Sequence, residues 1–194
     1  MSELESLETN MRYNEETDTV QIYFNDQWSD WAFGGLINID FLKEDVNNWV
    51  ITTVSGTSSG AANISYISSS GNLRFYTGST STDTSTAFTF IRSFRVNGTK
   101  ILYYTFTMEA GLGSSTSDYN KNNSCFYIQI STDGETWSNV TDSIGCEVLN
   151  TAKTFNGDLN LFAYSGQEIY IRVLGKSPAH NTGPQGYFSR FKIV

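Results

Sequence analysis

The single histidine of the chain, His180, lies in the segment LGKSPAHNTGPQG, which also holds both prolines. A lone loop histidine is usually solvated, and no serine of the chain is marked as a nucleophile by its surroundings. The sequence contains no HExxH, G-x-S-x-G, P-loop or Gly-rich dinucleotide motif, and no Cys/His spacing typical of zinc. We therefore predict no catalytic residue, no metal site and no cofactor.

Carboxylates offer the only other catalytic chemistry, because a glycoside hydrolase needs two of them across a cleft. Glu109 and Asp118 flank the loop AGLGSSTSDYNKNN, and Asp133 and Glu135 belong to an Asp-Gly turn. Solvated loop charges and a structural turn account for these acids without catalysis. We therefore expect that the chain is not an enzyme.

Sugar binding is the chemistry that the loops suit best. It needs aromatic faces that stack on sugar C–H bonds, together with amide and carboxylate groups that hydrogen-bond hydroxyls. Two segments have this composition, and they predict a glycan site made of Asp118, Tyr119, Asn120, Asn122, His180, Asn181 and Tyr187. Two alternatives stay open: Tyr119 packs on its own loop, or Tyr187 sits in the core, which is the favoured position for Tyr187.

Short alternating segments separated by Gly, Ser, Asn and Asp turns are the elements that would carry these loops. Leu102, Tyr104, Phe106 and Met108 share one face of a strand, and the same pattern recurs along the chain. It predicts strands at 49–54, 63–67, 73–76, 87–96, 100–109, 125–131, 136–140, 158–164, 168–174 and 187–194. Asn97-Gly98 predicts a two-residue hairpin turn. Ten such strands indicate an all-β jelly-roll β-sandwich.

The region before the sandwich predicts a small β-hairpin unit. Val20, Ile22 and Phe24 alternate with polar residues, and a turn follows at residues 25–27. We divide the chain into an N-terminal tail or short helix (1–10), a hairpin docking or oligomerisation unit (11–40) and the jelly roll (41–194). The docking residues predicted in the first two parts are Leu4, Leu7, Tyr13, Tyr23, Trp28 and Trp31.

Composition and charge limit the partners. The formal net charge of −8 argues against nucleic acid, which is bound through clustered Lys and Arg, and against anionic membranes. The N-terminal MSELESLET is too acidic and short for a secretory signal, and no segment reaches transmembrane length. We expect synthesis in a cytoplasm and no membrane insertion.

The two cysteines, Cys125 and Cys146, flank the hairpin that turns at Asp133-Gly134. Ladder counting places Cys125 opposite about residue 142. A disulfide is possible with a bend, and two buried thiols are the favoured alternative.

The segment YIQISTDGETWSNV, with the later EIYIRV and GYFSRFKIV, resembles concanavalin-like and MAM-like jelly-roll modules over roughly residues 45–194. Modules of this kind mostly bind glycans or proteins, or are structural, so the resemblance implies a binding function. Many relatives carry an acidic pair in the last strand, where this chain has Ser189 and Arg190.

The opening stretch MRYNEETDTVQIYFNDQW resembles a short unit common in bacteriophage tail-fibre, baseplate and head-fibre proteins. The matching residues are Met11, Arg12, Tyr13, Asn14, Thr17, Tyr23 and Trp28. The resemblance implies a virion component with other virion proteins as partners, a homo-oligomer with a trimer favoured, and a sandwich that faces host polysaccharide. The alternatives are a purely structural decoration or cementing protein, and a carbohydrate-binding module of a glycan-degrading system.

Overall fold

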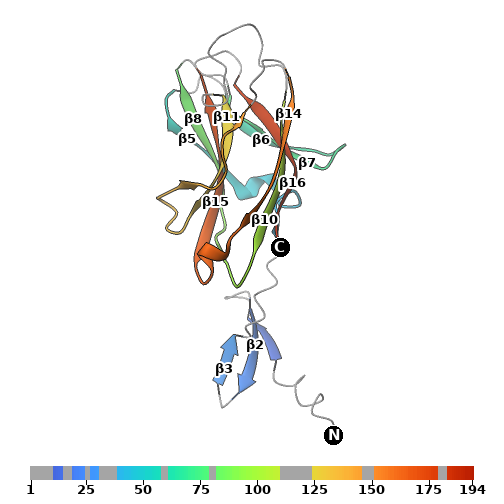
Figure 1. The fold of residues 1–194 in the computed structure, drawn as a ribbon, viewed down its shortest axis with the longest axis vertical. Coiled ribbons are helices and arrows are strands. Elements are labelled where there is room, and N and C mark those ends of the chain that lie inside the picture. Colours follow the sequence, from blue (N-terminus) through green and yellow to red (C-terminus); the bar gives the residue numbers. More distant parts are fainter. Residues whose placement is uncertain are drawn as a thin grey trace.

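A computed structural model describes residues 11–14, 19–24, 27–30, 39–57, 61–78, 82–109, 124–145, 151–178 and 183–194. The described chain is almost entirely β-structure, in three antiparallel sheets (Figure 1). Two of these sheets form a sandwich, so the predicted all-β jelly-roll sandwich is confirmed.

The first sheet is small and lies near the N-terminus. It contains β1 (Met11–Asn14), β2 (Thr19–Phe24) and β3 (Gln27–Asp30), in the order β1-β2-β3. The hairpin that sequence predicts here corresponds to β2 and β3, whose register places Phe24 opposite Gln27. The structure adds β1 as a third strand, because Met11–Asn14 pairs with Thr19–Ile22 on the other side of β2.

One layer of the sandwich, which we call the β10 sheet, has the order β14-β10-β16-β7-β6, with β4 pairing with β16. The bounds are β4 Ile39–Asp40, β6 Asn63–Ile67, β7 Asn72–Tyr76, β10 Ile101–Met108, β14 Lys153–Asn160 and β16 Gln185–Ile193.

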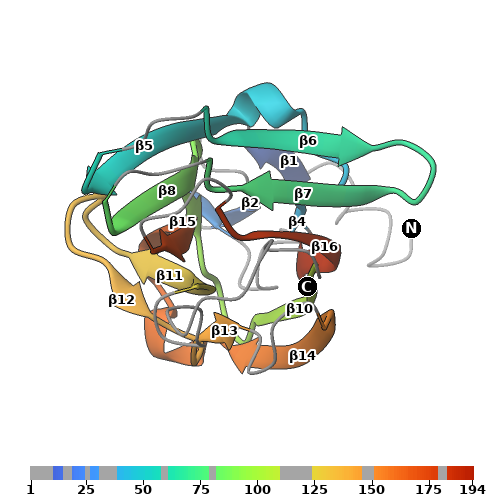
Figure 2. The ribbon, with the colours of Figure 1, turned by 90° about the horizontal axis from the view of Figure 1, so that it is seen from above.

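The other layer, the β15 sheet, has the order β12-β11-β15-β8-β5, with β13 pairing with β11 and β9 with β15. The bounds are β5 Trp49–Ser55, β8 Thr84–Phe90, β9 Phe94–Arg95, β11 Cys125–Ser131, β12 Ser138–Asn139, β13 Ile144–Gly145 and β15 Glu168–Ser177. Single-turn 3-10 helices lie at Val46–Asn48 and Phe162–Tyr164. Figure 2 shows the two layers facing each other, with β5 and β6 on one flank and β12 and β14 on the other.

The core fills the space between the two layers, and it is built from aromatic rings. Alternate residues of each strand point inward, since successive side chains of a strand point to opposite faces. The fully buried rings come from both sheets: Phe41, Phe75, Phe88, Phe90, Phe106, Phe126, Phe188 and Phe191. Phe188 and Phe191 stack with their centroids 4.3 Å apart, and Phe106 meets Phe188 edge-on at 4.6 Å.

The predicted hairpin turn at Asn97-Gly98 is wrong. Gly98 does have a positive φ of 68°, as a turn there requires. However, β9 pairs with β15 and β10 pairs with β14 and β16, so the turn carries the chain from one sheet to the other. The local Asn-Gly signal predicts a turn correctly but cannot tell which strands it joins.

The predicted position of Cys125 is also shifted. Cys125 lies opposite Gly145 rather than residue 142, because β12 and β13 pair with β11 as two separate short strands. The Cys125 side chain is buried. Cys146, the other cysteine, lies outside the described residues.

Candidate functional site

The outer face of the β10 sheet carries a band of polar and aromatic side chains. On β10, the buried Leu102, Phe106 and Met108 alternate with the half-buried Tyr103, Thr105 and Thr107. The same alternation on the neighbouring strands β16 and β7 exposes a matching set. We call this surface the β10 face, and it comprises Tyr103, Thr105, Thr107, Glu109, Gln185, Tyr187, Arg190, Arg74 and Tyr76.

Arg74 of β7 connects Gln185 of β16 with Glu109, the residue after β10, at one end of the β10 face. Its Nη2 lies 2.9 Å from Glu109 Oε2, and it donates a 2.6 Å hydrogen bond to Gln185 Oε1. The side chains of Arg74 and Glu109 keep 35% and 24% of their exposure, so this ion pair is half-buried and still open to solvent. A cation, a carboxylate and an amide are thus fixed side by side, and each retains capacity for further hydrogen bonds.

Tyrosines surround this polar cluster. Tyr187 lies opposite Arg74 on one side and Thr107 on the other, and it follows the buried Gly186 and precedes the buried Phe188. Tyr187 is therefore a half-buried residue of the outer face, and the alternative position in the core is wrong. Tyr76 lies opposite Gln185 on β7.

A second aromatic position lies farther along β10. The Arg190 guanidinium carbon lies 4.1 Å from the centroid of the Tyr103 ring, a cation–π distance. A register shift occurs between Thr105 and Phe106, where β16 carries one more residue than β10. Such a bulge re-aims side chains, and it places Arg190 on the outer face beside Tyr103.

Most of the predicted glycan residues lie outside the described part of the chain: Asp118, Tyr119, Asn120, Asn122, His180 and Asn181. The strand ends that flank their two segments do meet. Glu109, the last described residue before 110–123, donates its backbone N–H to the Gln185 carbonyl at 3.0 Å. Both segments therefore connect to the end of the β10 face that holds Arg74, Glu109 and Gln185.

Glu109 is the only member of the Glu109/Asp118 carboxylate pair within the described residues. Its carboxylate contacts Arg74, from a strand 35 residues earlier. Sequence analysis used the alternation along β10 to identify core residues and did not consider the residues that point to the outer face. The outward set Tyr103, Thr105, Thr107 and Glu109 follows from the same period of two.

The outer face of the β15 sheet is arranged differently, because its polar groups satisfy one another. Arg172 lies beneath the Trp137 ring at 4.2 Å and donates from Nε to Gln129 Oε1 at 2.6 Å. Gln129 in turn donates to Asn139 at 2.7 Å. Burial lowers the pKa of the Arg172 guanidinium. This cluster braces a sheet surface, and Trp137 packs on that surface.

Neighbouring residues of the same outer face are also paired with each other. Tyr127 lies beside Cys125 and beneath Lys176, whose Nζ is 5.2 Å from the ring centroid. Burial, together with a hydrogen bond to Cys125, raises the pKa of Tyr127 to about 12. Burial also raises the pKa of the Cys125 thiol, which makes it a weak nucleophile at neutral pH.

Asp133 serves the turn between β11 and β12. Its Oδ1 accepts the backbone N–H groups of Glu135 at 2.8 Å and Thr136 at 2.7 Å, and the Ser131 hydroxyl at 2.8 Å. These donors, the Thr136 and Glu135 amides first, hold the pKa of Asp133 well below its usual range. The side chain is committed to the backbone of its own turn.

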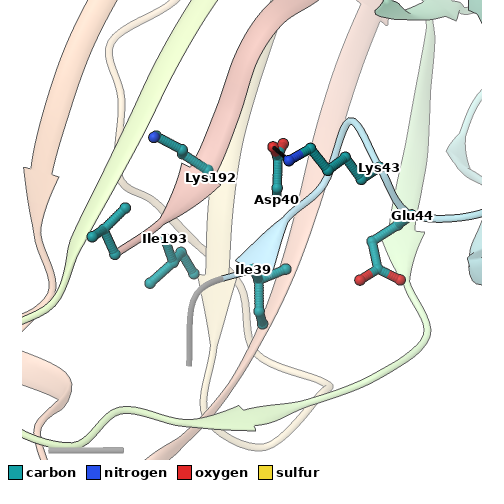
Figure 3. Close-up of a pocket in the computed structure, with 7 residues that line it drawn as sticks. Ile39, Asp40, Lys43, Glu44, Lys192 and Ile193 are labelled. Carbon is teal, nitrogen blue, oxygen red and sulfur yellow. Dashed lines mark ion pairs between the residues drawn. The ribbon is translucent and has the colours of Figure 1, made fainter. Parts of the chain in front are cut away.

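A pocket of about 420 Å³ adjoins the β10 face where β4 pairs with β16. Its lining includes Asp40, Lys43, Glu44 and Lys192 together with Ile39 and Ile193 (Figure 3). Lys43 Nζ lies 3.4 Å from Asp40 Oδ2.

Other predicted features have a limited structural counterpart. Of the docking residues, Leu4, Leu7 and Trp31 lie outside the described residues, and Tyr13 and Trp28 are described only as members of β1 and β3. Tyr23 of β2 is 38% exposed. Within the described ranges, no cluster of three His, Cys, Asp or Glu side chains could hold a metal ion. Nor does that part of the chain contain a helix long and apolar enough to span a membrane.

Comparison with known proteins finds similarity to solved structures at low sequence identity. No protein-family model matches the chain, and no curated protein matches it. A similar solved structure is TmCBM61 bound to β-1,4-galactotriose, at 13% identity and a TM-score of 0.48 over 80% of this chain and 93% of that one.

Two further solved structures are similar to this chain at low identity. A Lotus tetragonolobus seed lectin has 5% identity and a TM-score of 0.46 over 81% of this chain and 97% of that one. The enzymatically active domain of bacteriophage CBA120 tailspike protein 4 has 12% identity and a TM-score of 0.43 over 78% of this chain and 20% of that one. These likenesses concern the fold alone.

Proposed function

We propose that the protein binds carbohydrate on the β10 face. The observation that carries the proposal is the Arg74–Glu109–Gln185 cluster, held at 2.9 and 2.6 Å between the half-buried Tyr76 and Tyr187. Carboxylate, amide and guanidinium groups hydrogen-bond sugar hydroxyls, and tyrosine rings stack on the C–H faces of pyranoses. Both kinds of group meet on one surface.

The rigidity of the face favours binding. Arg74, Glu109 and Gln185 stand on or next to paired strands, and their mutual hydrogen bonds fix their side chains before any ligand arrives. A site ordered in advance loses less conformational entropy when it binds. The ligand class is an extended oligosaccharide, because the face spans three strands and continues from the Arg74–Glu109–Gln185 cluster at one end to Tyr103 and Arg190.

The test is oligosaccharide binding by the full chain, screened on a glycan array and quantified by calorimetry. We expect Tyr187→Ala and Glu109→Gln each to weaken binding at least tenfold, and Tyr187→Phe to retain most of it, because the ring remains. Tyr66→Ala is the matched control, since Tyr66 is 51% exposed and lies on β6 opposite the buried Leu73, away from the β10 face. Equal affinities for Tyr187→Ala and the parent chain would overturn the proposal.

We propose further that the three-stranded sheet β1–β3 docks the protein onto a virion, with the sandwich facing host polysaccharide. Two observations support this: the small sheet pairs only with itself among the described strands, and its sequence resembles phage fibre units. The proposed partners are other virion proteins and further copies of the chain, with a trimer favoured. Deleting residues 1–33 should abolish incorporation into particles and leave oligosaccharide affinity unchanged; incorporation of the truncated chain would contradict the docking role.

A further inference from the structure

The β5 edge of the β15 sheet is unpaired among the described residues and lacks the usual protection of sheet edges. β5 pairs with β8 on one side only. Trp49–Ser55 reads WVITTVS, with no charge and no proline. Every residue after Trp49 is exposed, including Val50 at 50%, Ile51 at 39% and Val54 at 49%. An uncharged, apolar edge of this kind is a template for pairing with another strand.

Two other edge strands of the sandwich, β12 and β14, differ from β5, whereas the edge strand β6 (NISYI) is likewise uncharged but has five residues against the seven of β5. β12, at the opposite edge of the same sheet, has only two residues, and β14 carries Lys153 and Asp158. Short strands and charges are devices that block edge-to-edge association. A β-bulge is another feature that protects an edge, and β5 has one between Thr53 and Ser55. This bulge lies at the end of the strand, so Trp49–Thr53 pairs regularly with β8.

We propose that β5 pairs antiparallel with β5 of a second copy of this chain, about a two-fold axis near Ile51 and Thr52. Three features point to a copy rather than to a foreign strand. A two-fold pair uses the β5 edge of both copies and leaves neither β5 edge open, so association through β5 stops at two copies instead of growing into a fibre. The outward sequence Val50-x-Thr52-x-Val54 places β-branched residues opposite one another in either direction, which stabilises cross-strand pairs.

Charge supplies the third feature. Copies of a chain with a net charge of −8 carry charge of the same sign and repel one another overall. The uncharged β5 segment brings two copies together without placing like charges opposite each other. Ile51 adds apolar area: it lies opposite the buried Phe88, on the core side, and keeps 39% exposure at the open flank of the sandwich.

Pairing through β5 also sets the direction of the two β10 faces. A two-fold axis perpendicular to the joined β15 sheets keeps the same face of each sheet on the same side. The β10 sheets of both copies, and therefore both β10 faces, would lie on one side of the dimer. Two weak sites presented in one direction gain effective concentration on a polymer or surface.

The test is the solution mass of the full chain measured by light scattering over a range of concentrations. The two-fold axis can pass through Ile51, which pairs residue 50 with residue 52, or through Thr52, which pairs residue 52 with its own copy. The double variant Val50→Lys/Thr52→Lys places two lysines opposite each other in either case, so its mass should fall to half that of the parent. The control is Thr132→Lys/Ser138→Lys, which adds the same charge at exposed positions at the opposite edge of the sheet and should keep the parent mass. Any assembly through β1–β3 is common to the parent and both variants, so a difference between their masses reports on β5.

Hydrogen–deuterium exchange of the unmodified chain gives a measurement without substitution. Amides of residues 50–54 should exchange more slowly as protein concentration rises, since pairing buries the free edge. Equal masses for the parent and Val50→Lys/Thr52→Lys, a halved mass in both double variants, or exchange of β5 that is independent of concentration would each overturn the proposal.

Discussion

Arg74 fixes the geometry of the candidate site, because one nitrogen of its guanidinium contacts side chains from two other segments, Glu109 and Gln185. These residues are 35 and 111 positions away from Arg74 in the chain. No local motif contains them, so sequence analysis located aromatic and amide residues in the flanking loops and missed the cluster on the strands. Composition predicted a site of aromatic, amide and carboxylate groups, but the strand register determines which of these residues are neighbours.

Asp133 provides a prediction about pH at the scale of a single residue. The amides of Thr136 and Glu135 lower the pKa of Asp133 in the folded protein. The ionised carboxylate therefore stabilises the folded state at pH values above the pKa of an unfolded Asp, about 4. This stabilisation is lost as the pH falls from there toward the pKa of the folded state. We expect Asp133→Asn to melt at a lower temperature than the parent at pH 7. The difference between the two melting temperatures should become smaller at roughly pH 3, where the carboxyl of the unfolded chain is largely protonated. Thermal melts at both pH values check this, and a constant gap would contradict it.

At the scale of elements, alternation predicted most strands to within a few residues, because the buried rings recur every second position. Asn63–Ile67 and Cys125–Ser131 have the bounds expected from sequence. Pairing was harder to predict: the turn at Asn97-Gly98 joins two sheets, and β1 pairs across a gap that sequence did not identify. Turn chemistry is local, whereas partner choice depends on how the whole core packs.

The aromatic core predicts a large cost for removing one ring. Phe188 is fully buried and contacts Phe75, Phe106 and Phe191 with centroids 5.5, 4.6 and 4.3 Å away. Phe188→Ala should lower the free energy of unfolding by about 3–5 kcal/mol in urea titration. Phe162 is 63% exposed, and Phe162→Ala should change the free energy by no more than about 0.5 kcal/mol. Similar losses for both variants would refute the assignment of the core.

Gly175 tests how closely the two sheets approach. A Cβ at this position of β15 would lie 2.4 Å from Thr77 Cγ2 and 2.9 Å from Phe126 Cε1. Gly175→Ala should therefore destabilise the fold by about 1–3 kcal/mol through overpacking. Ser85 on the neighbouring β8 has an outward, half-buried side chain. Ser85→Ala should therefore change the free energy of unfolding by no more than about 0.5 kcal/mol. Chemical denaturation of both variants decides, and an unchanged Gly175→Ala would show that the sheets lie farther apart.

At the scale of the whole molecule, the sandwich has two outer faces with different properties. The β15 face is internally satisfied, with Arg172 engaged by Gln129 and Trp137, whereas the β10 face holds polar groups beside half-buried tyrosines and retains hydrogen-bonding capacity. In our two proposals the sheets have different roles: the β15 sheet pairs with a second copy through β5, and the β10 sheet binds the ligand. A dimer through β5 would multiply the sites on one side, as adhesion to a polymer requires.

The most direct test of this account is a nuclear magnetic resonance titration of the isotopically labelled full chain with the oligosaccharide that binds best on the array. The account predicts that the largest chemical-shift changes fall on the outward residues of the β10 face, including Arg74, Glu109, Gln185 and Tyr187, and that outward residues of β11 and β15 stay unchanged. Shift changes centred on Gln129 and Arg172, or no change with any oligosaccharide, would contradict it.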